Sequence, residues 1–222
     1  TYSGSNPYRA PATLNTIQHV EYGLGSYICE GGVYRIVEVL LNLCKENGVQ
    51  FLFNSKVEKI NFLGNRVTSI DYLNNGGIST TESFDVVVSN ADVNSTYKNL
   101  LGDANSRAAK RYESLEPSLS AIVFYWGVEG NYPELETHNI IFSDSYKKEF
   151  KEIFELKKCP SDPTIYIYIS SKFNKSDAPE GFENWFVLVN APYISGQDWK
   201  KEVRQIRTKV INRINSMLKI DL

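Results

Sequence analysis

Between residues 164 and 170, three isoleucines alternate with two tyrosines, Tyr166 and Tyr168. Side chains of a β-strand point alternately to its two faces, so this segment predicts a strand with one aliphatic and one aromatic face. Such a strand suits a sheet whose aliphatic face is covered by helices. The alternation therefore predicts a sheet with two chemically different faces in the second half of the chain.

Three further β-prone runs, at 119–128, 140–142 and 185–191, are separated by loops and complete one predicted antiparallel sheet. Helices are expected at 147–157 and 199–218, and the second of these has a basic polar side. The second half of the chain is therefore predicted to be an α+β domain, an antiparallel sheet with helices.

The aromatic residues of these strands are candidates for the wall of an apolar ligand tunnel: Tyr125, Trp126, Tyr166 and Tyr168. His138 stands at the start of a strand, where it would line the same space or act as an acid or base. Plainer interpretations remain open, because aromatic residues more often form an ordinary core. His138 would then be a structural histidine.

The first half of the chain has a different pattern. A helix expected at 32–46 is followed by a short strand at 51–53 and a three-stranded meander at 57–62, 66–73 and 78–84. The order of these elements predicts an incomplete α/β layer of the Rossmann-like kind that carries a β-meander. The whole chain is therefore expected to be α/β plus α+β.

Two glycines open the first predicted helix. Glu30, Gly31 and Gly32 precede it, and the exposed N–H groups at a helix start favour an anion such as a pyrophosphate. An ordinary tight loop explains the same residues, so this signal is weak by itself.

A second candidate cofactor site follows the apolar run at 85–89, which suits a strand buried on both faces of a parallel sheet. Asn90 and Ala91 come at its carboxyl end, where open α/β sheets bind ligands. Asp92 is expected to cap the next helix, and capping alone accounts for it.

Composition narrows the class of function. A net charge of −2 argues against a nucleic-acid partner. The three cysteines and two histidines lack metal-ligand spacing, so no metal site is expected, and an odd number of thiols indicates a reducing compartment. No apolar run approaches the roughly 20 residues that span a bilayer, and no nucleophile motif supports a hydrolase.

With these residues in view, the chain resembles the phytoene desaturase (carotenoid desaturase) family of FAD-dependent oxidoreductases. The resemblance covers nearly all of the sequence and includes Gly31-Gly32, Ser-Asn-Ala-Asp at 89–92 and Ser-Asp-Ala-Pro-Glu-Gly at 176–181. The first two motifs are shared by amine-oxidase-like flavoproteins. The third is more particular to carotenoid desaturases and their close relatives.

The resemblance implies an enzyme that holds FAD and draws a linear polyene such as phytoene into an apolar tunnel. The flavin would accept a hydride while a proton leaves the neighbouring carbon, and the electrons would pass to a quinone or oxygen. A cytoplasmic location with peripheral membrane contact is implied, because the substrate dissolves in the bilayer. Val57 would contact the adenine, residues 30–32 and 90–92 would lie near the cofactor, and no catalytic residue is assigned.

The resemblance also implies a division of the chain. Residues 1–29 and 104–222 would belong to the substrate-binding domain, and 30–103 to part of the FAD-binding domain. The family's N-terminal G-x-G-x-x-G motif and its C-terminal flavin segment do not occur in the 222 residues. We therefore expect an internal fragment that neither binds FAD tightly nor turns over substrate.

Two other interpretations remain open at this stage. The same fold and cofactor serve polyene isomerases, oxygenases and retinoid saturases, and tunnel shape decides between them. A non-catalytic apolar-ligand or membrane-surface domain would use the aromatic sheet and the basic helix at 199–218 without a flavin.

Overall fold

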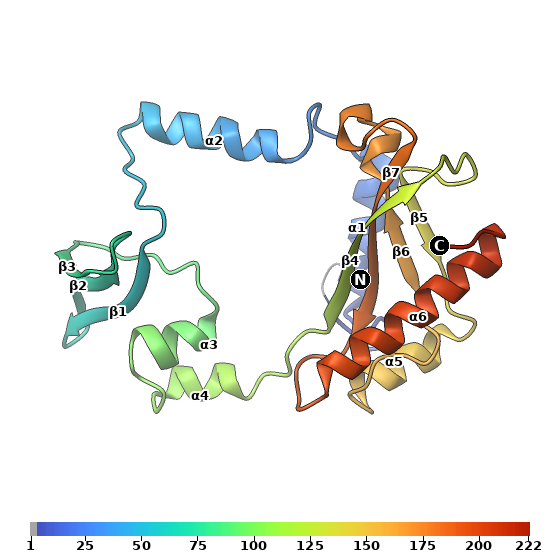
Figure 1. Ribbon diagram of the computed structural model, residues 1–222. Coiled ribbons are helices and arrows are strands. Elements are labelled where there is room, and N and C mark those ends of the chain that lie inside the picture. Colours follow the sequence, from blue (N-terminus) through green and yellow to red (C-terminus); the bar gives the residue numbers. More distant parts are fainter. Residues whose placement is uncertain (1–3) are drawn as a thin grey trace. The chain divides into compact units, whose positions relative to one another are not determined.

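A computed structural model describes residues 4–222 of the chain, which form two compact units (Figure 1). Residues 4–35 and 117–222 make up the first unit, and Ile36–Glu116 make up the second. The sequence-based boundaries at residues 29/30 and 103/104 remain predictions about domains.

The first unit contains a four-stranded sheet and two long helices. Its elements are η1 (Ala12–Asn15), α1 (Thr16–His19), η2 (Val20–Leu24), β4 (Ser120–Glu129), β5 (His138–Ile141), α5 (Tyr146–Phe154), β6 (Ile165–Tyr168), η4 (Ser170–Lys172), η5 (Lys175–Asp177), β7 (Phe182–Ala191) and α6 (Trp199–Leu218). The strand order is β4-β7-β6-β5, and every neighbouring pair is antiparallel. The predicted α+β architecture with one antiparallel sheet is confirmed.

The core of the first unit lies on the aliphatic face of this sheet. Ile165 and Ile167 of β6 and Val187 of β7 have no exposed surface. Helix α6 buries Ile206, Val210 and Ile214 against the same cluster, whereas Phe150 and Ile153 of α5 are buried outside this cluster. The apolar side of α6 is thus used within the fold, since its 3.6-residue periodicity matches the face that it covers.

The second unit is built on a three-stranded antiparallel meander. Its strands are β1 (Lys56–Leu63), β2 (Arg66–Leu73) and β3 (Ser79–Ser83), and its helical elements are α2 (Tyr34–Glu46, which begins in the first unit), α3 (Val93–Ser95), η3 (Thr96–Leu100) and α4 (Arg107–Glu113). The strand order β1-β2-β3 follows the chain. The predicted meander is confirmed.

Two predicted strands of the α/β layer are absent from the described residues. Residues 51–53 and 85–89 have no strand partner, and Val86 and Val88 are 76% and 88% exposed. An extended segment becomes a strand only when a neighbour accepts its backbone hydrogen bonds, and none of the described residues supplies that neighbour. Among residues 4–222 the predicted Rossmann-like layer is therefore not confirmed.

Candidate functional site

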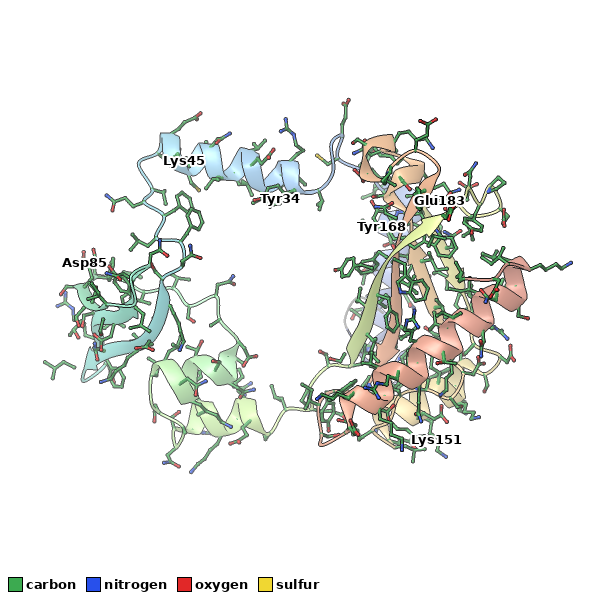
Figure 2. All side chains as sticks on the ribbon, in the orientation of Figure 1. Tyr34, Lys45, Asp85, Lys151, Tyr168 and Glu183 are labelled. Carbon is green, nitrogen blue, oxygen red and sulfur yellow. The ribbon has the colours of Figure 1, made fainter. Side chains whose placement is uncertain are left out.

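The second face of the four-stranded sheet carries a row of aromatic side chains. The strand register places Tyr125 opposite Phe186, Phe186 opposite Tyr168, and Tyr168 opposite His138, so that the row crosses all four strands. We call the surface formed by this row and its neighbours Val123, Leu188, Tyr166 and Ile140 the aromatic face. On each strand, the residues that alternate with those of the aromatic face point to the core. The two-faced sheet predicted from the sequence is therefore confirmed, and Figure 2 labels Tyr168 on this sheet.

Contacts along the row join the rings into one surface. The Tyr125 and Phe186 rings meet edge to face with centroids 5.4 Å apart, and the His138 ring stacks on Tyr168 at 4.9 Å. Tyr125 is 80% exposed. Flat aromatic rings with apolar neighbours suit a flat, conjugated or aliphatic ligand.

One polar pair interrupts the aromatic face. His138 Nδ1 and Tyr166 Oη lie 2.7 Å apart, within hydrogen-bonding distance. The two residues are diagonal neighbours, because His138 pairs with Tyr168 and Ile140 pairs with Tyr166 across β5 and β6. Burial, and then the nearby Tyr168, raise the pKa of Tyr166 above its ordinary value, so its phenol stays protonated at neutral pH.

Trp126 lies on the opposite face of the sheet from Tyr125, so it is not part of the aromatic face, and its predicted role in a tunnel wall stays a prediction. Adjacent strand residues point to opposite faces, so Trp126 packs against the core and stacks on Phe124 at 5.5 Å. A cavity of about 440 Å³ lies next to it, lined also by Tyr132, Arg207 and other residues of β4, α6 and the chain end.

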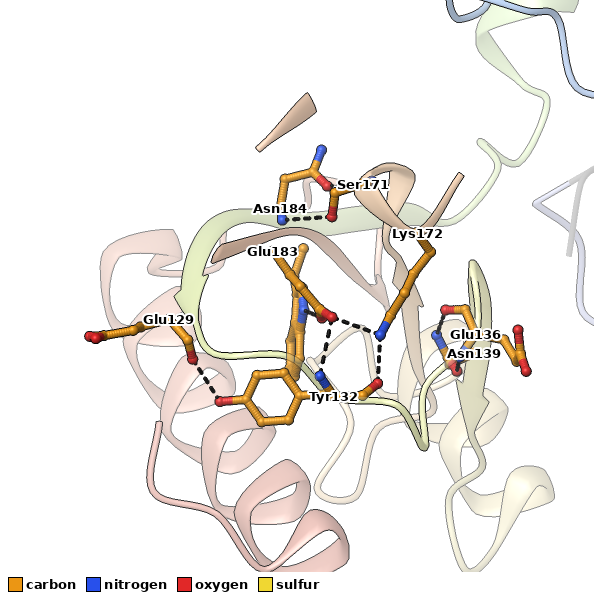
Figure 3. A network of polar contacts seen from close by, with 9 residues as sticks. Glu129, Tyr132, Glu136, Asn139, Ser171, Lys172, Glu183 and Asn184 are labelled. Atoms are coloured by element: carbon orange, nitrogen blue, oxygen red, sulfur yellow. Dashed lines mark hydrogen bonds and ion pairs between the residues drawn. The ribbon is translucent and has the colours of Figure 1, made fainter. Parts of the chain in front are cut away.

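A buried carboxylate at the start of β7, Glu183, was not predicted from the sequence (Figure 3). Glu183 accepts hydrogen bonds from the Tyr132 backbone N–H at 3.2 Å and the Trp185 indole N–H at 2.9 Å, and it pairs with Lys172 Nζ at 2.7 Å. Lys172 also donates to the Tyr132 carbonyl oxygen at 2.6 Å. Burial alone would raise the pKa of Glu183, but Lys172, Trp185 and Tyr132 together hold that pKa below its ordinary value.

Two more buried carboxylates hold α5 to the loop before β6. Glu149 accepts from the Thr164 backbone N–H and hydroxyl at 3.2 and 2.6 Å, and Glu152 accepts from the Ser161 backbone N–H and hydroxyl at 2.7 and 3.0 Å. These bonds satisfy the carboxylates within the fold. Neither glutamate is therefore free to serve a ligand, and both are structural.

Gly31 and Gly32 form a turn immediately before α2. Their φ angles are +77° and +90°, which glycine adopts without the steric cost of a Cβ atom. The Gly32 N–H donates to the Cys29 carbonyl at 2.9 Å, and the Arg35 N–H donates to the Gly32 carbonyl at 3.1 Å. A Cβ atom at Gly32 would meet nothing within 4 Å, so space is open beside the turn, and Glu30 next to it is exposed.

The other predicted cofactor residues belong to the second unit. Val57 lies on β1, an edge strand of the meander, so part of its strand's backbone is unpaired. Asn90 and Ala91 are exposed and lie outside any strand. Asp92 accepts a hydrogen bond from the Ser95 N–H at 3.0 Å, which confirms that it caps the following helix.

The predicted cofactor residues are divided between the two units. Residues 30–32 lie in the first unit, while Val57 and residues 90–92 lie in the second. Within residues 4–222, no cluster of histidine, cysteine, aspartate or glutamate is arranged to hold a metal ion. A search of the same residues finds no helix with the length and hydropathy needed to cross a bilayer.

The fold and the aromatic face together define an α+β protein that offers a broad apolar surface on one side of an antiparallel sheet. A crystal structure of a protein from Pyrococcus furiosus shares the fold, with a TM-score of 0.53 and 22% identity over 85% of this chain and 40% of that one. No protein-family model matches the chain.

Comparison with characterised proteins gives a more specific relationship. The chain is 41% identical to a 1-hydroxycarotenoid 3,4-desaturase of a Flavobacterium species and 34% identical to a 4,4'-diaponeurosporene oxygenase of Staphylococcus haemolyticus. Both matches cover the whole chain but only 44% and 43% of the relatives, so the chain spans less than half of their length. The resemblance stated from the sequence is confirmed: the chain is a member of the carotenoid desaturase-like family.

Proposed function

We propose that the protein containing this chain is an FAD-dependent enzyme that modifies a carotenoid, with desaturation as the reaction. The observation that carries the proposal is the 41% identity to a 1-hydroxycarotenoid 3,4-desaturase across the entire chain. Desaturation and oxygenation of a polyene are both oxidations, and the two named relatives differ in this respect. An oxygenated product is therefore the alternative outcome.

The first unit would bind the polyene. The aromatic face is apolar except for the His138–Tyr166 pair, and its row crosses four strands, roughly 14 Å at the usual strand spacing. A long hydrocarbon would lie against these rings with little loss of hydrogen bonds to water. Because such a substrate partitions into bilayers, we expect peripheral contact with the cytoplasmic membrane surface.

The second unit and the glycine turn would form part of the flavin-binding region. The Gly31-Gly32 turn precedes a 13-residue helix and leaves open space beside it, which fits the approach of a pyrophosphate. Val57 on the open edge of β1 would face the adenine, and residues 90–92 would lie near the cofactor. When bound, FAD supplies the two-electron acceptor for the oxidation, with a quinone or oxygen as the final acceptor.

Exposed apolar side chains support a longer functional protein. No residue of α2 is buried, although Ile36, Val37 and Leu40 give it an apolar side. Globular proteins rarely leave such a helix face in water. Together with the partial coverage of the relatives, this supports the proposal that a further part of the protein packs on α2 and pairs with residues 51–53 and 85–89.

The test is to purify the full-length protein and this chain in parallel. We expect the full-length protein to carry stoichiometric flavin and to convert a carotenoid precursor to a product with a longer conjugated system, seen as a red-shifted visible spectrum. This chain alone should retain no flavin after added FAD is removed by gel filtration. A full-length protein that binds neither flavin nor polyene would refute the proposal, and a product of unchanged conjugation that carries oxygen would favour the oxygenase.

A further inference from the structure

The aromatic face of the described structure carries few polar groups. Besides the Tyr125 and Tyr168 hydroxyls, they are the His138 ring and the Tyr166 hydroxyl, which form a pair. It lies at the β5 end of the row, and the side chains aligned with it across the strands are apolar: Ile140 and Leu188 oppose Tyr166. Asn184, two residues before Phe186 on β7, is a polar residue on the same side of the sheet, and its side chain is engaged with Ser170 and Ser171. The pair is therefore not explained by packing alone.

The chemistry of the pair leaves hydrogen-bonding capacity unused. A neutral imidazole and a phenol together carry one N–H and one O–H, and their mutual hydrogen bond at 2.7 Å uses only one of these protons. If Tyr166 donates to Nδ1, the Nε2–H of His138 remains as a donor and the phenol oxygen as an acceptor. If Nδ1–H donates to Tyr166, the phenol O–H remains as a donor and Nε2 as an acceptor.

One donor and one acceptor are thus left over in either tautomer. Among residues 4–222, no further hydrogen bond of the His138 ring is present, and its side chain is exposed. An alcohol carries the matching functions, since its oxygen both donates and accepts. A hydrocarbon end group would displace water from the pair without replacing those bonds, which costs binding energy.

We infer that the His138–Tyr166 pair recognises a hydroxyl group at one end of a linear polyene, with the hydrocarbon chain lying across Phe186 toward Tyr125. This inference rests on the proposed function and specifies its substrate class as a hydroxylated rather than a purely hydrocarbon carotenoid. The name of the 41% identical relative, a 1-hydroxycarotenoid desaturase, agrees with this chemistry. Both residues act as binding groups, and no bond of the substrate changes at them.

The test compares two polyenes of equal length and conjugation, one with a terminal hydroxyl and one without. Their equilibrium binding to the full-length protein is measured by the shift of the polyene spectrum, and kcat/KM is measured for each. The variants are Tyr166→Phe and His138→Phe, which keep the rings and remove the polar atoms. The matched control is Tyr168→Phe, which removes a hydroxyl from the same face that has no hydrogen bond in the described structure.

The native protein should prefer the hydroxylated polyene, and each test variant should lower that preference about tenfold, the effect of one neutral hydrogen bond. The control should change both polyenes equally and keep the ratio. Equal binding of both polyenes by the native protein, or a preference that survives in both test variants, would overturn the inference and leave the proposed function standing. If neither polyene binds, the proposed function fails as well. Two test variants are used so that a folding defect in one, seen by circular dichroism, leaves the other decisive.

Discussion

Replacement of Glu183 by alanine should destabilise the first unit more than any surface change near it. The carboxylate has a side chain only 5% exposed and binds three groups: the Tyr132 N–H, the Trp185 indole and Lys172, whose side chain is 16% exposed. These contacts join the loop after β4, which contains Tyr132, to β7 and to η4, which contains Lys172 (Figure 3). Without the carboxylate, the lysine charge and the indole N–H stay in a poorly hydrated place.

The size of the effect follows from these partners. Removal of one member of a buried ion pair usually costs about 3–5 kcal/mol, because the remaining charge is left uncompensated. The two neutral donors would each add up to about 1–3 kcal/mol if water could not reach them. We expect a loss of about 3–5 kcal/mol for Glu183→Ala, because water entering the vacated space would offset part of the second contribution.

The assay is urea unfolding followed by tryptophan fluorescence. The chain has three tryptophans, Trp126, Trp185 and Trp199, and all of them lie in the first unit, so the signal reports on that unit. Glu129→Ala is the matched control, because Glu129 is an exposed residue of β4 and accepts the Tyr132 hydroxyl through its backbone carbonyl, which the substitution keeps. The control should change the free energy of unfolding by less than about 0.5 kcal/mol.

The pH dependence gives an independent check. The folded-state pKa of Glu183 lies below its ordinary value, so its contribution to stability is fully present above the unfolded pKa of about 4.3. That contribution should be lost as the pH falls through the folded pKa. The difference between the native chain and Glu183→Gln should therefore shrink below about pH 4. A loss under 1 kcal/mol for the alanine variant, or a difference that does not change with pH, would refute the reasoning.

Three further perturbations test the core, a thiol and a helix cap. Ile214→Ala on α6 opens a cavity at a fully buried position and should cost about 2–5 kcal/mol in urea unfolding, whereas Met217→Ala at an exposed position should cost less than about 0.5 kcal/mol. Burial, and then a hydrogen bond to a neighbouring glutamate, raise the pKa of Cys159 to about 12, so at pH 8 iodoacetamide should modify two thiols quickly and the third only in denaturant, as read by intact mass. Asp92→Ala should cost about 1 kcal/mol and lower hydrogen-exchange protection of the Ser95 amide, and unchanged protection would show that the cap is unimportant.

The periodic parts of the fold could be predicted from the sequence. The alternation of isoleucine and tyrosine predicted the two faces of β6, and the turn residues predicted the strands of the meander. Apolar residues at 3.6-residue spacing predicted the buried side of α6. These signals are local, because each element repeats the pattern of the surface that it packs against. The candidate residues Tyr166, Tyr168 and His138 could be placed on one face for the same reason.

The buried carboxylates required more than local pattern. Glu183 falls on the same strand face as Trp185 and Val187, so the alternation that located β6 would also have located it. Glu149 and Glu152 gave no such signal, since a helix rich in lysine and glutamate has the composition of a solvated surface. Their burial depends on Thr164 and Ser161, which are distant donors that no local pattern reveals.

The expected α/β layer is not confirmed, for a different reason. The apolar run at 85–89 has the composition of a buried parallel strand, but composition does not provide the neighbouring strand. The run therefore stays exposed in this chain. The predicted cofactor residues stay a prediction, and the structure divides them between its two units.

The first unit is made of two segments that are separated in sequence by the second unit, and this has a consequence for synthesis of the chain. Residues 4–35 join a sheet whose strands all come after residue 117, and the Leu119 N–H bonds back to the Gly4 carbonyl at 2.9 Å. The meander, by contrast, pairs strands that are neighbours in sequence and close by short turns. During synthesis the meander can therefore pair its strands as soon as they emerge, whereas residues 4–35 are made well before β7, the last strand of the sheet that they join.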